Sequence, residues 1–233
     1  YAILDKLNRT EVKIITLEDP IEYHLQGITQ TQIDPEHEFP FSIGLKHALR
    51  QDPDIIMVGE IRDKITASTA LHASLTGHLL LTTFHTNSAA ATFIRLLDMG
   101  IRPFLLVGSI NVAMAQRLVR KLCPKCKEEY QPTEDEINTL RHLALDDKLK
   151  VDKIYRRKGC PECNSTGYKG RIAIAEAITP SKKLEGAILK KPTQTEIEEI
   201  AQEQGSSNMA QDGVNRVING TTSLEELLRV VAE

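Results

Sequence analysis

Short apolar runs alternate with helical patterns along the first half of the chain. Three apolar, partly β-branched runs predict buried strands at residues 12–17, 54–59 and 79–84. Apolar residues at helical spacing predict four helices, at residues 41–51, 65–74, 88–97 and 103–118, the first with Ser42 as its start. Strands that alternate with helices indicate an α/β fold in which a mostly parallel sheet lies between helices.

The second half of the chain has a different character, and the chain divides into three predicted parts. Residues 1–120 form the α/β part, residues 121–175 hold all four cysteines and many basic residues, and residues 176–233 are polar with several acidic clusters. Capping pairs and apolar stripes predict further helices at residues 133–145, 193–204, 209–218 and from 223 onward. The last part is therefore expected to be a helical region.

Composition and charge argue against several classes of protein. The 233 residues carry 29 Lys and Arg against 32 Asp and Glu, a net charge of −3, which argues against a nucleic-acid coat. The chain has no Trp, so a base-stacking platform is not expected. No apolar run approaches the roughly 18 residues of a membrane span, and no leader typical of secretion is visible at the start.

Polar side chains follow each of the three predicted strands. Glu18 and Asp19, with Glu22 nearby, follow the first strand, Glu60 follows the second, and His85 follows the third. Ligands of parallel sheets bind beyond the carboxyl ends of the strands, where one carboxylate can hold Mg²⁺ while another polarises an attacking water. Taken singly, each residue is more typical of a turn, a solvated loop charge or a structural histidine. Three polar strand ends in one sheet favour a phosphate site.

Two C-x-x-C pairs predict a zinc site. Cys123 and Cys126 form the first pair, and Cys160 and Cys163 form the second, after residues 127–159. Four thiolates suit tetrahedral Zn²⁺ and leave no open position, so the expected site is structural. Two disulfides and an iron–sulfur cluster are the alternatives; the first is disfavoured without an export signal, and the second by the spacing.

Several long segments resemble motifs of the secretion-superfamily ATPases. The segment ITLEDPIEY (15–23) resembles their Asp box, LRQDPDIIMVGEIRD (49–63) their Walker B segment, and TGHLLLTTFHTN (76–87) their His box. QRLVR (116–120), which leads into Cys123, also matches. The chain thus resembles the type II secretion and type IV pilus assembly ATPases, which commonly have a four-cysteine insertion that the retraction ATPases lack.

The resemblance implies a fold, an activity and a set of partners. It implies a RecA-like P-loop NTPase fold and a homo-hexamer at the cytoplasmic face of the inner membrane. It also implies ATP hydrolysis with Mg²⁺ that drives pilin or pseudopilin assembly, together with inner-membrane platform and cytoplasmic adaptor proteins. No nucleic acid is expected as a partner. The motifs do not separate secretion from pilus assembly.

The resemblance also implies roles for individual residues. Glu60 would be the Walker B acid that acts through Mg²⁺, and Glu18 would activate the water, with Asp19 and Glu22 as less favoured candidates. His85, with His78 behind it, would belong to the phosphate-sensing box. Two arginines would support the site or a subunit contact, with surface ion pairs as an equal alternative: Arg62 and Arg117.

The phosphate-binding loop of this family is missing from the sequence. No Gly-x-x-x-x-Gly-Lys-Ser/Thr segment occurs, and in the family that loop comes just before the segment that residues 1–4 resemble. We therefore expect this chain alone to bind ATP very weakly and to be inactive as an ATPase. A zinc-bearing scaffold or nucleic-acid-binding module without enzymatic activity is the alternative. The basic run at residues 153–158 is either a solvated face or a docking patch for a membrane platform protein or anionic lipid.

Overall fold

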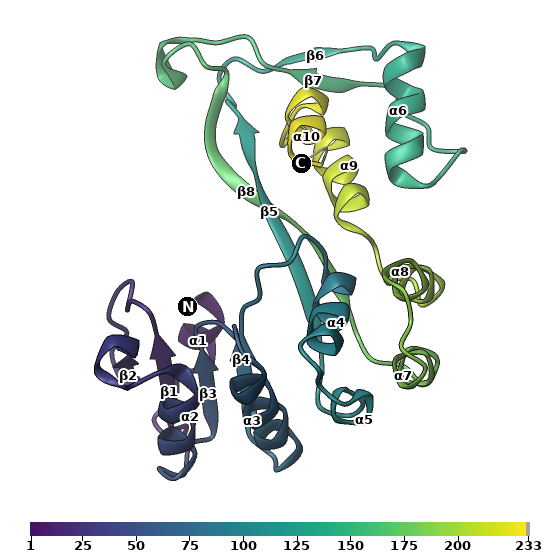
Figure 1. The fold of residues 1–233 in the computed structure, drawn as a ribbon. Helices are drawn as coiled ribbons and strands as arrows, with labels where there is room; N and C mark the ends of the chain where they lie inside the picture. The colour runs from purple at the N-terminus through teal and green to yellow at the C-terminus, as the bar shows by residue number, and fades with distance from the viewer. Residues whose placement is uncertain (232–233) are drawn as a thin grey trace. The chain divides into compact units, whose positions relative to one another are not determined.

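The computed structural model describes residues 1–231, which form two compact units (Figure 1). The first unit comprises Tyr1–Val112 and Thr179–Ile197, and the second comprises Ala113–Ile178 and the chain from Glu198 onward. The predicted division into residues 1–120, 121–175 and 176–233 stays a prediction.

The first unit is built on a four-stranded parallel sheet with the strand order β2-β1-β3-β4. Its strands are β1 (Ile14–Glu18), β2 (Thr29–Gln32), β3 (Ile55–Val58) and β4 (Leu79–Thr82). Its helices are α1 (Ala2–Leu7), α2 (Phe41–Leu49), α3 (Lys64–Leu75), α4 (Ala89–Asp98), α5 (Pro103–Leu106) and α7 (Lys182–Leu189), with a 3₁₀ turn at Pro35–His37. The parallel sheet with helices is confirmed.

Helices pack on both faces of this sheet. Ile14 of β1 and Ile55 of β3 pack with Leu4 of α1 in one buried cluster. Leu17 points to the opposite face, because side chains alternate along a strand, and it packs beside Gly44 of α2. The register places Leu17 opposite Val58, and Val58 opposite Thr82, so that three neighbouring strands end at one edge.

Two helices of the first unit begin close to the strand ends and carry side-chain caps. Asp63 caps α3 by accepting hydrogen bonds from the backbone N–H groups of Ile65 and Thr66, both at 2.9 Å. Ser88 caps α4 in the same way, through the N–H of Ala91 at 3.1 Å. These caps fix where the chain leaves β3 and β4, and hence where Glu60 and His85 lie.

The second unit contains two antiparallel ribbons and a group of helices. β5 (Ala113–Leu122) pairs with β8 (Tyr168–Ile178), and β6 (Glu128–Tyr130) pairs with β7 (Ile154–Arg156). Figure 1 shows α9 (Met209–Ile218) and α10 (Leu224–Val231) beside the long β5–β8 ribbon. α6 (Glu134–Ala144) has the predicted capping box of Thr133 and Glu136, and a 3₁₀ turn lies at Pro161–Cys163. α8 (Gln194–Glu203) crosses the boundary of the two units.

Three details of the predicted elements are wrong. Residues 103–118 are not one helix: α5 ends at Leu106, and β5 begins at Ala113 with buried and exposed side chains alternating as in a strand. β4 is an edge strand rather than a buried one, so Leu79 is 38% exposed. α2 begins at Phe41 with Pro40 before it, so Ser42 does not start the helix.

Candidate functional site

The carboxyl ends of β1, β3 and β4 bring the predicted strand-end residues to one edge of the sheet. Glu18 is the last residue of β1, and Glu60 and His85 follow β3 and β4. The N–H of Gly59 donates to the carbonyl of Leu17 at 2.7 Å, and the hydroxyl of Thr83 donates to the carbonyl of Gly59 at 2.6 Å. These bonds hold the turn that carries Glu60 between its two neighbouring strands.

Glu60 lies at the centre of a charged group. Its carboxylate accepts a hydrogen bond from Nη2 of Arg62 at 2.5 Å, and its Oε2 lies 3.3 Å from Nε2 of His85. The Glu60 side chain is 12% exposed, whereas Arg62 and His85 are 63% and 88% exposed, so a shielded acid lies beneath two accessible bases. Arg62 also lies 3.9 Å from Oδ2 of Asp19, which connects the ends of β1 and β3.

The charges around Glu60 keep its carboxylate ionised. The hydrogen bond from Arg62 is the largest cause that lowers the pKa of Glu60, and the charges of Arg62 and His85 lower it further, against the effect of partial burial. Its Oε2 accepts no hydrogen bond from the residues that the structure describes. Glu60 therefore presents an ionised carboxylate beside His85, the kind of group that holds a hydrated cation.

Glu18 is held differently, by three hydrogen-bond donors. Its carboxylate is 3% exposed and accepts hydrogen bonds from the hydroxyl of Tyr1, from the hydroxyl of Thr16 at 2.5 Å and from Nε2 of Gln30 at 3.0 Å. Within residues 1–231, no hydrogen bond or ion pair joins it to Glu60. Glu22 is exposed, and its N–H donates to the hydroxyl of Tyr1 at 3.1 Å. The Asp-box acids thus share the edge without contacting Glu60 directly.

Two of the predicted residues belong to other parts of the fold. His78 comes before β4, at its opposite end, where Nδ1 lies 3.2 Å from the carbonyl of Ala73 and 3.3 Å from the hydroxyl of Thr76. Arg117 lies in β5 of the second unit and donates to the carbonyl of Val230 at the end of α10. His78 thus lies at the other end of β4 from the strand ends, and Arg117 belongs to the second unit.

Three residues of the site were not predicted from the sequence: Tyr1, Thr16 and Gln30. Thr16 was accessible to pattern reasoning, because a residue two positions before Glu18 in a strand shares its face. Gln30 gave no such signal, since its place beside Glu18 depends on the parallel pairing of β1 with β2, which puts Thr16 opposite Gln30.

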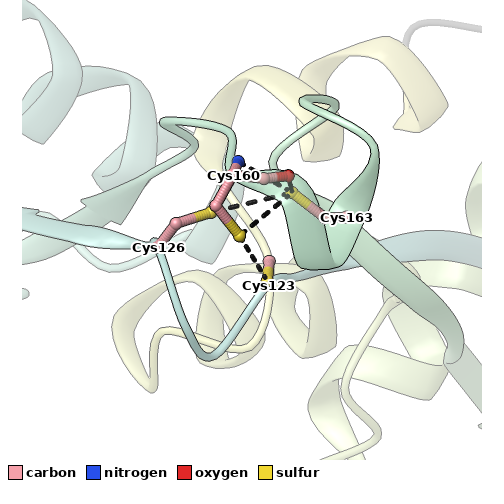
Figure 2. A group of neighbouring side chains, drawn as sticks. All are labelled: Cys123, Cys126, Cys160 and Cys163. Carbon is pink, nitrogen blue, oxygen red and sulfur yellow. Dashed lines mark hydrogen bonds between the residues drawn. The ribbon is translucent and has the colours of Figure 1, made fainter.

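The four cysteines form one cluster in the second unit (Figure 2). Their sulfur atoms all lie within 4.8 Å of one another, with separations of 3.9 Å for Cys123 and Cys160, 3.8 Å for Cys126 and Cys163, and 3.7 Å for Cys160 and Cys163. The edge of a ZnS₄ tetrahedron with bonds of about 2.3 Å is about 3.8 Å. A disulfide needs sulfurs about 2.05 Å apart, and all four cysteines are free. The geometry fits a tetrahedral metal ion and excludes the predicted alternative of two disulfides.

We call the turn at each C-x-x-C pair a knuckle. Backbone amides of the second knuckle, at Cys160 and Cys163, face a sulfur of that pair. The N–H groups of Cys160 and Gly167 both donate to Sγ of Cys163 at 3.2 Å. Although burial raises the pKa of the Cys163 thiol, these N–H groups lower it to about 6. Gly159 needs its positive φ of 106° here, and a Cβ on it would lie 2.6 Å from the carbonyl oxygen of Ser165. The turn is shaped to present thiolates to a cation.

The basic run at residues 153–158 is neutralised by acidic partners. Lys153 pairs with Glu129 at 2.9 Å, Arg156 and Lys158 pair with Glu128 at 3.4 and 2.6 Å, and Arg157 pairs with Glu225 at 3.1 Å. A patch whose charges are paired attracts an anionic surface weakly. This pairing favours the solvated face over the docking patch.

Comparison with known proteins identifies the family. The sequence model described as "Type II/IV secretion system protein" matches residues 1–229. The chain belongs to this family. Type II secretion system protein E of Pseudomonas aeruginosa is 46% identical over 233 residues, which are 100% of this chain and 45% of that protein. The type IV pilus assembly ATPase PilB of the same species is 43% identical over 234 residues, covering 100% of this chain and 41% of that protein.

Solved structures of two ATPases are similar to this chain. The pilus retraction motor PilT, solved with bound ADP, matches with a TM-score of 0.67 and 25% identity, covering 98% of this chain and 55% of that one. The structure of the Legionella pneumophila ATPase DotB matches with a TM-score of 0.65 and 24% identity, covering 99% of this chain and 55% of DotB. This match supports the fold alone. The chain spans less than half the length of the two curated relatives above. Among residues 1–231, no helix has both the length and the apolarity to cross a membrane.

Proposed function

We propose that this chain is the catalytic portion of a RecA-like, P-loop motor ATPase of type II secretion or type IV pilus assembly. In this proposal, hydrolysis of ATP drives the assembly of pilins or pseudopilins. The observation that carries it is the shielded, ionised Glu60 at the joined ends of β1, β3 and β4, with one carboxylate oxygen facing His85. Family membership supports the same activity and does not favour the alternative of a scaffold or nucleic-acid-binding module.

Each residue at this edge has a proposed role. Glu60 would hold a water of hydrated Mg²⁺, which would supply charge neutralisation on the phosphates of ATP when bound. Glu18 is proposed to orient and deprotonate the attacking water, with Asp19 and Glu22 as the other candidates. His85 would contact the terminal phosphate, and Arg62 keeps Glu60 ionised. For Arg117 and His78 we propose a supporting role only.

The remaining parts of the proposal concern the metal and the assembly. The four cysteines are proposed to hold structural Zn²⁺, since their sulfurs fit its tetrahedron and no fifth ligand is offered by the cluster. A complete site would also need a phosphate-binding loop, which this sequence lacks, so the isolated chain is expected to be inactive. We propose a homo-hexamer at the cytoplasmic face of the inner membrane, with platform and adaptor proteins as partners.

Replacing Glu60 tests the proposed function. In a full-length protein that contains a phosphate-binding loop, Glu60→Gln keeps the size of the side chain but removes the charge that a hydrated Mg²⁺ needs. We expect turnover of ATP to fall at least about 100-fold, as for the loss of a positioned catalytic group. Steady-state phosphate release measures this.

The control for this experiment is Glu11→Gln, an exposed acid outside the site. We expect it to leave turnover within about twofold of the parent, in line with the small effects of surface substitutions. Parent-like turnover in Glu60→Gln would overturn the role of Glu60, and with it the ATPase proposal.

A further inference from the structure

Gln30 connects the buried carboxylate of Glu18 to the loop between β1 and β2. Its Nε2 donates to Oε1 of Glu18 at 3.0 Å and to the carbonyl of Tyr23 at 3.2 Å. Its Oε1 accepts the N–H of Leu25 at 2.7 Å. The amide therefore uses its oxygen and both of its N–H groups. One N–H bonds Glu18, and the other N–H and the oxygen bond the loop.

The orientation of this amide is fixed by its surroundings. If the group were flipped, its oxygen would face the carboxylate of Glu18 and the carbonyl of Tyr23, and its NH₂ would face the N–H of Leu25. Each of these contacts would be repulsive, because it would pair two acceptors or two donors. The pairing of β1 with β2 adds to this constraint, since it places Gln30 directly opposite Thr16, and Thr16 donates to the same oxygen of Glu18.

We propose that Gln30 is a positioning residue for ATP hydrolysis, which fixes the carboxylate of Glu18 and couples it to the loop that carries Asp19 and Glu22. This inference rests on the proposed function, and in particular on Glu18 as the acid that orients water. A carboxylate can accept about four hydrogen bonds, and Gln30, Thr16 and Tyr1 account for three of them. The fourth direction lies on Oε2, and Gln30 helps to fix it by holding Oε1 together with Thr16.

The hydrogen bonds of Gln30 to the loop allow a movement of the loop to change the position of Glu18. Tyr23 and Leu25 lie between Glu22 and β2, so a displacement of this loop moves the amide that holds Glu18. Nucleotide or a neighbouring molecule that orders the loop would thereby align Glu18. A purely structural role for Gln30 would instead affect the stability of the sheet without lowering kcat of the folded protein.

Two substitutions of Gln30 in the full-length protein separate these roles. Gln30→Met removes the donor at similar size, and we expect kcat for ATP to fall about tenfold with KM within about twofold, because positioning is lost while binding remains. Gln30→Glu places a second carboxylate beside Glu18, and we expect the acid limb of the pH–rate profile to move to higher pH by about one unit or more. Gln32→Met, in the same strand, is the control and should retain parent kcat.

A double substitution tests whether Gln30 acts through Glu18. In the Glu18→Gln background, Gln30→Met should lower kcat by less than about twofold further, because residues that act as a unit are not additive. Independent, multiplicative effects would overturn the inference. So would parent-like kcat in Gln30→Met or in Glu18→Gln, or an unmoved acid limb in Gln30→Glu. If Glu60→Gln abolishes turnover while the Gln30 variants behave as the parent, the inference fails and the proposed function survives.

Discussion

Replacing Cys163 with serine is expected to abolish zinc binding and to unfold the part of the second unit that surrounds the four cysteines. Serine is a poor zinc ligand, and the three remaining thiolates leave an incomplete tetrahedron. Binding of structural zinc contributes on the order of 10 kcal/mol or more to the folding of small zinc modules, so its loss exceeds what the local packing can replace. Elemental analysis for zinc and a thermal unfolding curve measure both effects.

Unfolding should extend from the first knuckle into the turn before α10. The N–H of Leu122, next to Cys123, donates to the carbonyl of Thr221 at 2.8 Å. Nζ of Lys127, next to Cys126, donates to the carbonyl of Gly220 at 2.8 Å. Hydrogen exchange should therefore accelerate at residues 219–223 in Cys163→Ser as well as around the knuckles.

The matched control for the cysteine variant lies in the same turn. Glu162 stands between Cys160 and Cys163, and its side chain forms an exposed ion pair with Lys169 at 3.4 Å. Glu162→Gln should keep zinc at one ion per chain and should melt within a few degrees of the parent, because such surface pairs contribute little. Zinc retained at full occupancy in Cys163→Ser would contradict the metal assignment.

The strand ends and the cysteine cluster could be predicted because their signals are local. A buried parallel strand is a continuous apolar run, so β1 and β3 were visible in the sequence, and the polar residue after each run marks the edge of the sheet. Each C-x-x-C pair places two metal ligands within four consecutive residues, so the pattern can be recognised without knowledge of the fold. Glu60 and His85 therefore lie beside each other, because they follow neighbouring strands of a parallel sheet.

Long-range pairing could not be predicted in the same way. Residues of β5 have apolar positions that fit a helix as well as a strand, and only the antiparallel partner β8, which begins at Tyr168, decides between the two. β2 reads TQTQ and has no apolar alternation, so neither the strand nor the contact of Gln30 with Glu18 was visible. The exposure of β4 follows from its place at the edge of the sheet, which no local pattern encodes.

The second large effect is expected at Glu226, a fully buried acid of α10. Its side chain is 0% exposed, and two arginines converge on it. Arg120 donates through its backbone N–H at 3.0 Å, through Nε at 2.8 Å and through Nη2 at 2.5 Å. Arg229 donates through Nε at 3.1 Å and through Nη2 at 2.8 Å. Glu226 thereby joins β5 to α10 within the second unit.

The pKa of Glu226 makes this acid a source of pH-dependent stability. Although burial raises the pKa, the hydrogen bonds from Arg229 and Arg120 lower it from 4.5 to about 2. Because the folded pKa lies below the unfolded one, the stabilisation is fully present above about pH 5 and is lost as the pH falls toward 2. One pKa unit corresponds to about 1.4 kcal/mol, so the whole contribution is about 3 kcal/mol.

Glu226→Gln should therefore lower the free energy of unfolding by about 3 kcal/mol at pH 7, since it leaves two arginines facing a neutral group. The difference between variant and parent should shrink as the pH is lowered from 5 toward 3, because the parent carboxylate becomes protonated there in the unfolded chain. Denaturant unfolding at several pH values measures this, and taking the difference removes the loss of zinc that acid causes in both proteins. Glu225→Gln, the exposed neighbour that pairs with Arg157, should cost less than about 1 kcal/mol at every pH. A Glu226→Gln penalty that matches this control, or that stays constant with pH, would show that the two arginines stabilise the fold through packing rather than through the buried charge.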